Sequence, residues 1–317
     1  MQSIQNELNI FEEQFAGQLQ DGEGPAHFLL QHIAGQHGGR LRPKTVMLAA
    51  GMQGGITPET IRMSVLVEML HSASLVHDDI VDDAKKRRDK QTINDIFGGK
   101  VAVLLGDLLF SKVLGMIRDS ALPGVLDHVM DAVGRLTRGE ICQLSQRNNL
   151  DISEADYKRI VVMKTASLFE VSFRLGAVSA GATPEEAEAY AAFGQRFGVF
   201  FQYKDDWKDF AFENDGKGCY NDLREGDVTL PVICAMQRLC MTDRAEFRRR
   251  YLQVTKDEGT LAALAETVAH CGALEQVGSI LQTMEEELLA SCAQFPASPY
   301  REDLMDAIRK VGSVQTV

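Results

Sequence analysis

The sequence predicts an all-α protein of ten or more helices, and three observations favour this class. Strand signals are scarce, since the chain has no Asn-Gly hairpin turn and no sustained alternation of polar and apolar residues. Helix-start signals are abundant, and glycine-containing breaks at 51–55, 98–99 and 216–218 separate the helical stretches. The chain has 317 residues, 45% of them hydrophobic, which is enough to bury a sizeable core. We expect a single domain over residues 1–317.

Capping residues place helix starts in order along the chain. Thr57-Pro58-Glu59 combines an N-cap, a proline at the first helical position and an acid in the first turn. Ser153 opens a further helix, and Thr183 opens another with a capping box. Thr229 precedes one more. The helices from Thr57 and Thr183 each run about 30 Å before reaching a cluster of aspartates. Apolar residues leave the first of them little polar face, so we expect it to be central and buried.

Composition and charge argue against several classes of function. The formal net charge of −12 and the pI of about 5.1 disfavour a nucleic-acid partner. Six cysteines form no CxxC pair, which is typical of thiols in a reducing compartment. The first residues lack the features of a signal peptide, and no apolar stretch approaches the roughly 20 residues of a membrane span. We therefore expect a soluble, cytoplasmic protein without a transmembrane segment.

Two aspartate clusters share the spacing D-D-x-x-D, which places the i and i+4 carboxylates on one face of a helix. Acids near a helix C-terminus face the negative pole of the macrodipole, which is unfavourable by roughly 0.3–1 kcal/mol each and favours a bound cation. Oxygen ligands of this kind suit Mg²⁺ that also binds substrate phosphates. A single acidic cluster is more often a solvated helix face. Two copies of this spacing, each after an apolar helix of matching length, favour a functional role instead. The first cluster is Asp78, Asp79, Asp82 and Asp83, and the second is Asp205, Asp206 and Asp209.

Basic residues lie close to both clusters in the sequence. Lys85, Lys86, Arg87 and Arg88 follow the first cluster, and Lys217 follows the second. A lone basic run is usually surface charge. Beside a metal cluster, however, guanidinium and ammonium groups predict a clamp for a diphosphate.

Eight ordered stretches carry a resemblance that extends over nearly the whole chain. They are GGRLRP (38–43), LHSASLVHDDIVDD (70–83), RR (87–88), GD (106–107), GEICQ (139–143), KTASLF (164–169), FFQYKDDWKD (200–209) and GKGCYNDLREGDVTLP (216–231). Any one of them would be weak, but all eight in this order are specific. The chain resembles the trans-isoprenyl diphosphate synthases, the polyprenyl synthetase family, and most of all its long-chain, octaprenyl-type members.

The resemblance implies an isoprenoid synthase fold, a single large helical bundle around a central cavity, usually homodimeric. It implies that the two aspartate motifs face each other and hold three Mg²⁺ ions with an allylic diphosphate. The implied metal ligands are Asp78, Asp79, Asp82, Asp205, Asp206 and Asp209. The implied allylic diphosphate ligands are Arg87, Lys164, Thr165, Gln202 and Lys217, and those of isopentenyl diphosphate are Arg40, His71 and Arg88.

The implied reaction needs charge stabilisation rather than a nucleophilic side chain. A C–O bond ionises to an allylic cation and diphosphate, whose charge is stabilised by metals and by Arg87 and Lys164. The isopentenyl double bond then attacks the cation, and a proton is lost. In the family, the residues four and five positions before the first aspartate line the growing tail. Here they are the small Ser74 and Ala73, so we expect an all-trans product longer than farnesyl, of the octaprenyl type.

Three positions depart from the family pattern. Gly39 and Asp227 stand where lysines are expected, and Asp89 stands where glycine is usual. Each lost charge-assisted hydrogen bond weakens a diphosphate site by roughly 1.5–3 kcal/mol. His37 or Lys44 is a possible substitute for the missing cation near Gly39.

Other functions stay open at this point. A class I terpene cyclase shares the first metal motif and the ionisation step, but its second motif typically mixes Asn, Ser or Thr with Glu. A non-catalytic partner subunit that binds a prenyl diphosphate tends to lose its aspartate motifs, which this chain keeps, although the missing lysines favour it. The eight ordered stretches argue against an acidic protein that binds divalent ions loosely.

Overall fold

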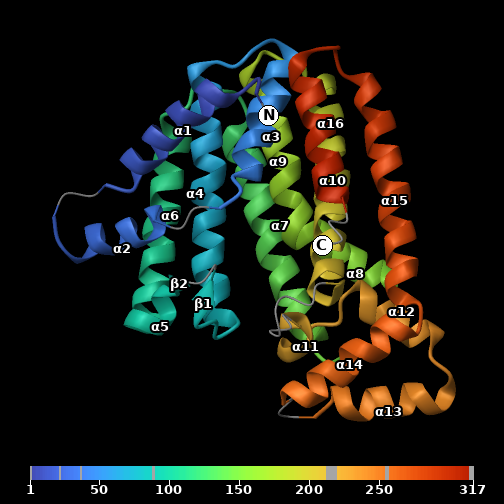
Figure 1. Cartoon of the computed structure of the whole chain (residues 1–317). Coiled ribbons are helices and arrows are strands. Elements are labelled where there is room, and N and C mark those ends of the chain that lie inside the picture. The colour runs from blue at the N-terminus through green and yellow to red at the C-terminus, as the bar shows by residue number, and fades with distance from the viewer. Residues whose placement is uncertain are drawn as a thin grey trace. The chain divides into compact units, whose positions relative to one another are not determined.

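The computed structural model describes residues 2–20, 23–35, 38–87, 90–211, 220–253 and 257–313 (Figure 1). Within these ranges the regular structure is helical apart from two strands of two residues each, so the predicted all-α class is confirmed. His37, Arg88, Asp89 and Lys217, which the sequence singled out, lie outside the described residues.

More than ten helices follow one another along the described chain, as expected. In order they are α1 (Gln5–Gln18), α2 (Pro25–Ala34), α3 (Leu41–Gln53), α4 (Pro58–Val81), α5 (Ile93–Phe97), α6 (Gly99–Arg118), α7 (Val125–Gln146), α8 (Glu154–Val161), α9 (Ser167–Ser179), α10 (Pro184–Ala211), α11 (Asn221–Glu225), α12 (Leu230–Arg238), α13 (Met241–Tyr251), α14 (Glu258–His270), α15 (Ala273–Ser291) and α16 (Pro299–Gly312). A π-helical turn, η1 (Val162–Ala166), joins α8 to α9, and a 3-10 turn, η2 (Cys292–Gln294), follows α15.

The predicted helix starts are confirmed, and three of them have side-chain caps, whereas Thr229 precedes α12 without a side-chain cap hydrogen bond among the described residues. The Thr57 hydroxyl oxygen accepts a hydrogen bond from the backbone N–H of Thr60 at 3.1 Å, at the start of α4. Ser153 caps α8 in the same way. At α10 the capping box is reciprocal, because the Thr183 N–H donates to the Glu186 carboxylate at 2.8 Å and the Glu186 N–H donates to the Thr183 hydroxyl at 3.3 Å. These local signals were readable because each involves residues only three positions apart.

A small antiparallel pair of strands was not expected from the sequence. β1 (Lys86–Arg87) pairs with β2 (Lys90–Gln91), with Lys86 opposite Gln91 and Arg87 opposite Lys90. Two residues are too few to produce the alternating pattern by which a strand is recognised. The pair lies directly after the first aspartate cluster and gives Arg87 a fixed place there.

The chain divides into two compact units, and α4 is the central helix of the first. Unit 1 comprises residues 1–131, 168–194 and 294–306. Helices α1, α3, α5 and α6 pack against α4. Val65, Leu66 and Val67 are at most 1% exposed, so successive faces of the helix are buried, as expected. The first aspartate cluster is therefore at the end of a rigid core element.

Unit 2 comprises residues 132–167, 195–293 and 307–317, and it includes the part of α10 that carries the second aspartate cluster. Helices α8, α14 and α15 pack against the apolar α12. The indole N–H of Trp207 on α10 donates to the Leu274 carbonyl at 3.2 Å. Lys204, which is 2% exposed, donates to the carbonyl of Gly312, the last residue of α16, at 3.2 Å. These contacts hold α10 on both sides of its Asp205-Asp206 pair.

None of the helices in the described ranges combines the length and the apolar character that a membrane crossing requires.

Candidate active site

The first aspartate cluster lies at the C-terminal end of α4, where Asp78 and Asp79 are in the last turn and Asp82 caps the helix. Successive helical residues are about 100° apart, so His71, Asp78 and Asp82 share one face within about 40°. Asp79 lies beside this face and is 5% exposed. The sequence spacing therefore placed the i and i+4 carboxylates correctly, two turns beyond His71.

Arg87 contacts the buried carboxylate of this cluster. Its Nε donates to Asp79 Oδ1 at 2.7 Å from β1. Burial raises the pKa of Asp79, the positive charge of Arg87 opposes that rise, and the charge of Asp82 adds to it. The base predicted to stabilise a leaving diphosphate thus lies next to a predicted metal ligand.

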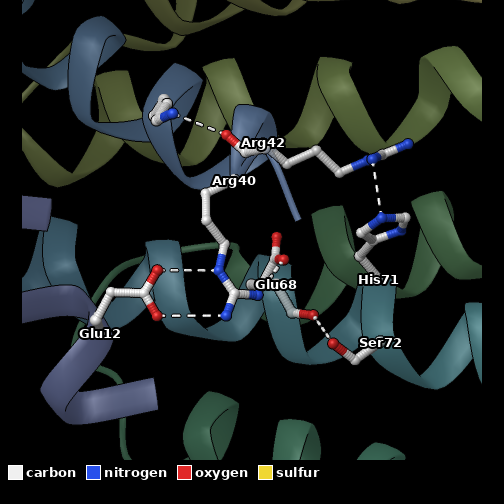
Figure 2. Close-up of polar contacts among 8 residues, drawn as sticks. Glu12, Arg40, Arg42, Glu68, His71 and Ser72 are labelled. Carbon is white, nitrogen blue, oxygen red and sulfur yellow. Dashed lines mark hydrogen bonds and ion pairs between the residues drawn. The ribbon is translucent and has the colours of Figure 1, made fainter. Parts of the chain in front are cut away.

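Two arginines at the start of α3 reach neighbouring turns of α4 (Figure 2). Arg42 Nη1 lies 3.1 Å from His71 Nε2. Arg40 Nη1 instead donates to Glu68 at 2.7 Å, and its Nε donates to Glu12 of α1 at 3.0 Å. The two unit 1 residues predicted for isopentenyl diphosphate therefore differ in their contacts. His71 has a cation beside it, whereas Arg40 is engaged by two carboxylates.

A recess in unit 1 joins these groups. Its lining includes Arg40, Glu68, His71, Ser72 and Asp79. The buried member of the first aspartate cluster and His71 therefore border the same recess.

The predicted tail-lining residues lie one turn before the aspartates. Ala73 is 3% exposed, and Ser74 is half-buried with its hydroxyl donating to the His71 carbonyl at 2.9 Å. Both are small, and α6, which packs against α4, carries the half-buried Leu108 and Phe110.

The second aspartate cluster, in unit 2, is held by neutral donors. Asp206 is 2% exposed; its Oδ2 accepts from the Tyr157 hydroxyl at 2.5 Å, and its Oδ1 accepts from the Gln202 side-chain N–H at 2.9 Å. Gln202 in turn accepts from the Thr165 hydroxyl at 2.7 Å. Three residues predicted from the sequence, Thr165, Gln202 and Asp206, are thus brought into one hydrogen-bonded chain.

The other carboxylates of this cluster lie in different surroundings. Asp205 is exposed, whereas Asp209 is half-buried and accepts from the backbone N–H groups of Asn221 and Asp222, both at 3.2 Å. Burial raises the pKa of Asp206 to about 7, against hydrogen bonds from Gln202 and Tyr157 that lower it. Burial also raises the pKa of Asp209, and it raises that of Asp222 well above its usual range, with the neighbouring aspartates adding to both. These acids need a cation before they can all ionise.

Lys164 and Thr165 lie in the π-helical turn η1, which joins α8 to α9. Such turns are rare and often occur at functional sites. Gly139 of α7 lies against this turn, because a Cβ at Gly139 would be 2.6 Å from the Lys164 backbone nitrogen. Lys164 Nζ lies 2.5 Å from the carboxylate of the adjacent Glu140. The stretches GEICQ and KTASLF therefore meet in space.

Known proteins are similar to this chain over most of its length. The Polyprenyl synthetase family model matches residues 26–268. The chain belongs to the polyprenyl synthetase family. Octaprenyl diphosphate synthase of Escherichia coli (strain K12) is 32% identical over 276 residues, which cover 86% of this chain and 85% of that protein. The all-trans-nonaprenyl-diphosphate synthase (geranyl-diphosphate specific) of Rhodobacter capsulatus is 32% identical over 282 residues, covering 88% and 86%.

Solved structures of the polyprenyl synthetase family agree in fold. A polyprenyl synthase from Caulobacter crescentus CB15, crystallised with calcium and isoprenyl diphosphate, has a TM-score of 0.91 to this chain at 30% identity, covering 99% and 97% of the two chains. A decaprenyl diphosphate synthase from Rhodobacter capsulatus has a TM-score of 0.90 at 28% identity, covering 98% and 97%. The predicted isoprenoid synthase fold is thereby confirmed.

Two departures from the family pattern have local compensation. Asp227 is 5% exposed, accepts from Arg147 Nε at 3.0 Å, and also accepts from the Gln143 side chain. The added acid is therefore neutralised within unit 2. Near the missing lysine, Lys44 Nζ donates to the Gly39 carbonyl at 2.8 Å, which places an ammonium group where the sequence lacks one. The third departure, Asp89, lies outside the described residues.

Four residues of the site escaped the sequence analysis: Arg42, Glu68, Tyr157 and Glu140. Arg42 and Glu140 lie inside stretches that carry the family resemblance, GGRLRP and GEICQ. The spacing of residues in the sequence did not reveal that they contact His71 and Lys164. Tyr157 precedes Lys164 by two turns, and a buried tyrosine hydroxyl generally requires a hydrogen-bond partner. That requirement was the one signal in the sequence that could have pointed to Tyr157.

The carboxylates of the two aspartate clusters are suited to binding Mg²⁺ together with a substrate. In the described ranges no three or more His, Cys, Asp or Glu side chains are grouped so as to hold an ion by themselves. Mg²⁺ is commonly bound by one or two carboxylates together with waters and substrate phosphates. Pairs of aspartates at D-D-x-x-D spacing, with raised pKa values at Asp79, Asp206 and Asp209, suit an ion that is shared with a diphosphate.

Proposed function

We propose that this protein is a Mg²⁺-dependent prenyltransferase that condenses isopentenyl diphosphate with an allylic diphosphate. Its product is an all-trans polyprenyl diphosphate longer than farnesyl. The observation that carries this proposal is the pair of D-D-x-x-D motifs in a chain of the polyprenyl synthetase family. Each motif has one carboxylate, Asp79 or Asp206, that is at most 5% exposed and has a raised pKa.

The allylic diphosphate is proposed to bind both aspartate motifs through three Mg²⁺ ions. The metal ligands are Asp78, Asp79, Asp82, Asp205, Asp206 and Asp209, and bound Mg²⁺ would neutralise charge on the departing diphosphate. Arg87 and Lys164 supply cations to the same diphosphate from within their units. Thr165 and Gln202 orient Asp206 through the hydrogen bonds described above. Lys217 belongs to the same proposed set.

Isopentenyl diphosphate is proposed to bind beside His71. Arg42, which contacts His71, supplies the guanidinium group that this site needs, and Lys44 adds an ammonium group near Gly39. Arg88 is the further base expected from the sequence. A pair of cations and a ring N–H suit a diphosphate better than either charge alone.

In the proposed reaction every bond broken or formed is between substrate atoms, and no covalent bond to the enzyme is needed. The allylic C–O bond breaks, and its electron pair leaves on the diphosphate oxygen. The isopentenyl double bond supplies the pair for the new C–C bond, and the resulting cation loses a proton to a diphosphate oxygen. The protein's residues hold the two diphosphates, stabilise the leaving charge and exclude water from the cation.

A long product is supported by the small side chains at Ala73 and Ser74. The relatives named above are octaprenyl, nonaprenyl and decaprenyl synthases, which make long chains. We propose an octaprenyl-type product.

A cytoplasmic homodimer is proposed as the working form. Large apolar side chains that are exposed on α6, and others exposed on α7, support it, because exposed apolar surface is typical of an interface between chains. Those on α6 are Val103, Leu104 and Leu114, and those on α7 are Leu126, Met130, Ile141 and Leu144.

One incubation tests the function against its two alternatives. The purified protein is given Mg²⁺, labelled isopentenyl diphosphate and allylic primers of several lengths, and the products are identified after dephosphorylation. We expect polyprenols longer than farnesol. Cyclised hydrocarbon alone would favour a terpene cyclase. Failure to turn over any primer despite a folded protein would favour a non-catalytic partner subunit.

A further inference from the structure

Arg40 is buried between carboxylates of two different helices. Its Nε and Nη2 donate to Glu12 Oε1 and Oε2 at 3.0 and 3.3 Å, and its Nη1 donates to Glu68 Oε1 at 2.7 Å (Figure 2). The Cζ atom also lies 4.6 Å from the centroid of the Phe15 ring. All three nitrogens of the guanidinium group are therefore engaged inside unit 1, and Arg40 is only 8% exposed.

The charge of this cluster has the wrong sign for binding an anion. One guanidinium faces two carboxylates, and Glu68 is itself 5% exposed. A diphosphate that approached Arg40 would be repelled by both acids and would have to displace one of them. Displacing Glu68 would leave a buried carboxylate without its partner, which is strongly unfavourable.

The side-chain contacts of Arg40 also stabilise its backbone conformation at the start of α3. Arg40 is the N-cap of α3 and has φ 50° and ψ 35°, in the left-handed region that is unfavourable for residues other than glycine. Its carbonyl accepts from the Lys44 N–H at 3.1 Å, which begins the helix. The contacts with Glu12 and Glu68 hold the residue in this conformation, so they fix the point and direction from which α3 starts.

The start of α3 places Arg42. Arg40 and Arg42 are two residues apart, and they contact Glu68 and His71, which lie one turn apart on α4. Two contacts on successive turns fix the register of α3 against α4. Glu68 and His71 also line the same recess, so a shift of Arg40 would be transmitted to the Arg42–His71 pair.

We infer that Arg40, clamped by Glu12 and Glu68, is a positioning residue that sets Arg42 against His71 and does not itself bind the diphosphate. The inference rests on the proposed function for the identity of the anion, isopentenyl diphosphate. It assigns to α1, through Glu12, a part in building the substrate site.

Glu68→Gln separates positioning from direct binding, because the two roles predict opposite signs. If Arg40 bound the diphosphate, removing a competing negative charge would tighten isopentenyl diphosphate. If Arg40 positions Arg42, losing the ion pair loosens the site and weakens the ligand. The replacement is nearly isosteric, so the fold is expected to survive, which circular dichroism and thermal unfolding would check.

The measurement is the dissociation constant of isopentenyl diphosphate by calorimetry, together with KM for each substrate using farnesyl diphosphate as the primer. We expect Glu68→Gln and Glu12→Gln to weaken isopentenyl diphosphate, Glu68→Gln by about 10-fold, with a much smaller change in KM for the primer. Glu188→Gln is the control, since it alters an exposed carboxylate of unit 1 that is paired with Arg174 and does not line the recess. It should leave both values unchanged.

A double-mutant cycle completes the test. Arg40→Met should weaken isopentenyl diphosphate at least as much as Glu68→Gln, and adding Glu68→Gln to it should cause little further loss, because Glu68 acts through Arg40. Tighter or unchanged binding in Glu68→Gln would overturn the inference, as would equal losses for both substrates. Calorimetry does not require turnover, so an inactive wild-type protein that still binds isopentenyl diphosphate would refute the proposed function without affecting this inference.

Discussion

The two aspartate motifs have the same spacing but different electrostatic surroundings. In the first, the buried Asp79 has a guanidinium partner, Arg87, at 2.7 Å. In the second, both oxygens of the buried Asp206 accept from uncharged groups, the Tyr157 hydroxyl and the Gln202 amide. Asp209 likewise accepts from backbone N–H groups. The buried acid of the first motif therefore has a charged partner, whereas the buried acid of the second has hydrogen bonds from uncharged groups that orient it.

This difference indicates how far each motif depends on an added cation. Burial raises the pKa of both Asp79 and Asp206, but only at Asp79 does an arginine oppose the rise. The second motif is therefore expected to be the more metal-dependent of the two. Identical sequence spacing gives the same placement of carboxylates, but their charge balance depends on neighbouring groups that differ between the motifs, Arg87 at Asp79 and Tyr157 and Gln202 at Asp206.

The largest effect is expected at the more accessible acids, Asp78 and Asp205. Either Asp78→Asn or Asp205→Asn should lower kcat by about 10²–10³-fold, because each removes a charge that stabilises the leaving diphosphate through metal. Steady-state turnover with saturating Mg²⁺ is the measurement. Asp151→Asn, at an acid paired with Arg248 on the surface, is the control and should behave as wild type. Near-normal kcat in Asp205→Asn would contradict the metal assignment of the second motif.

Replacing the cation of the first motif should have the next largest effect. Arg87→Met is expected to lower kcat/KM for the allylic primer by about 10–100-fold, since it removes both a diphosphate ligand and the partner of Asp79. Arg87→Lys should restore part of the activity, because an ammonium group keeps the charge but not the fork geometry. If the methionine variant needed no more Mg²⁺ than the lysine variant, the built-in counter-charge of this motif would be in doubt.

Removing a neutral donor from the second motif should have a smaller effect. Tyr157→Phe is expected to lower activity by about 10-fold and to raise the Mg²⁺ concentration at half-maximal rate, because Asp206 loses the group that orients it. Tyr203→Phe offers a matched control, since that hydroxyl is buried and has no hydrogen-bond partner among the residues that the structure describes. A change in rate with no change in Mg²⁺ dependence would argue against orientation of a metal ligand.

The pH dependence of stability should distinguish the motifs further. Asp206 has a pKa of about 7 in the fold against an ordinary 3.8, so the folded protein keeps a proton that the unfolded chain loses between these values. The free energy of unfolding of the metal-free protein should therefore fall as the pH rises from about 4 to 7. Thermal unfolding without Mg²⁺ should show a flatter pH dependence in Asp206→Asn than in wild type. Parallel curves for the two proteins would contradict the raised pKa.

The smallest expected effect on rate is at Ala73, the tail-lining position, because replacing it leaves the charged groups of both aspartate motifs in place. Ala73→Tyr should shorten the product, because a bulky ring on α4 blocks the path of the growing chain. Chromatography of the dephosphorylated products measures the length, and Ala73→Ser provides a size-conserving comparison. An unchanged product in the tyrosine variant would remove the argument for chain-length control at this helix.

Much of the fold could be predicted because its signals are local. Thr57 and Thr183 cap their helices through residues three positions away, and the D-D-x-x-D spacing fixes which carboxylates share a face. The long apolar run before Asp78 identified α4 as a core helix. Each of these depends on neighbours along the chain, so no knowledge of the tertiary structure was needed.

The partners of Arg40 and Asp206 could not be predicted, because they depend on long-range contacts. The sequence predicted Arg40 and not Arg42 as a diphosphate ligand, since neither the left-handed backbone at Arg40 nor its contact with Glu12 is visible in the sequence. Tyr157 reaches Asp206 across 49 positions of sequence. The facing of the two motifs, the single domain and the homodimer stay predictions.

The buried contact between Lys204 and Gly312 has a practical consequence for how this protein is handled. Lys204, which precedes Asp205 in the sequence, donates through its ammonium group to the Gly312 carbonyl at the end of α16, near the C-terminus of the chain. Trimming the chain into α16 would strand a buried donor, at a cost of about 1–3 kcal/mol or more for a charged group. Truncations that enter α16 would therefore disturb the helix that bears the second acidic motif, and such shortened chains would be poor starting points for assays.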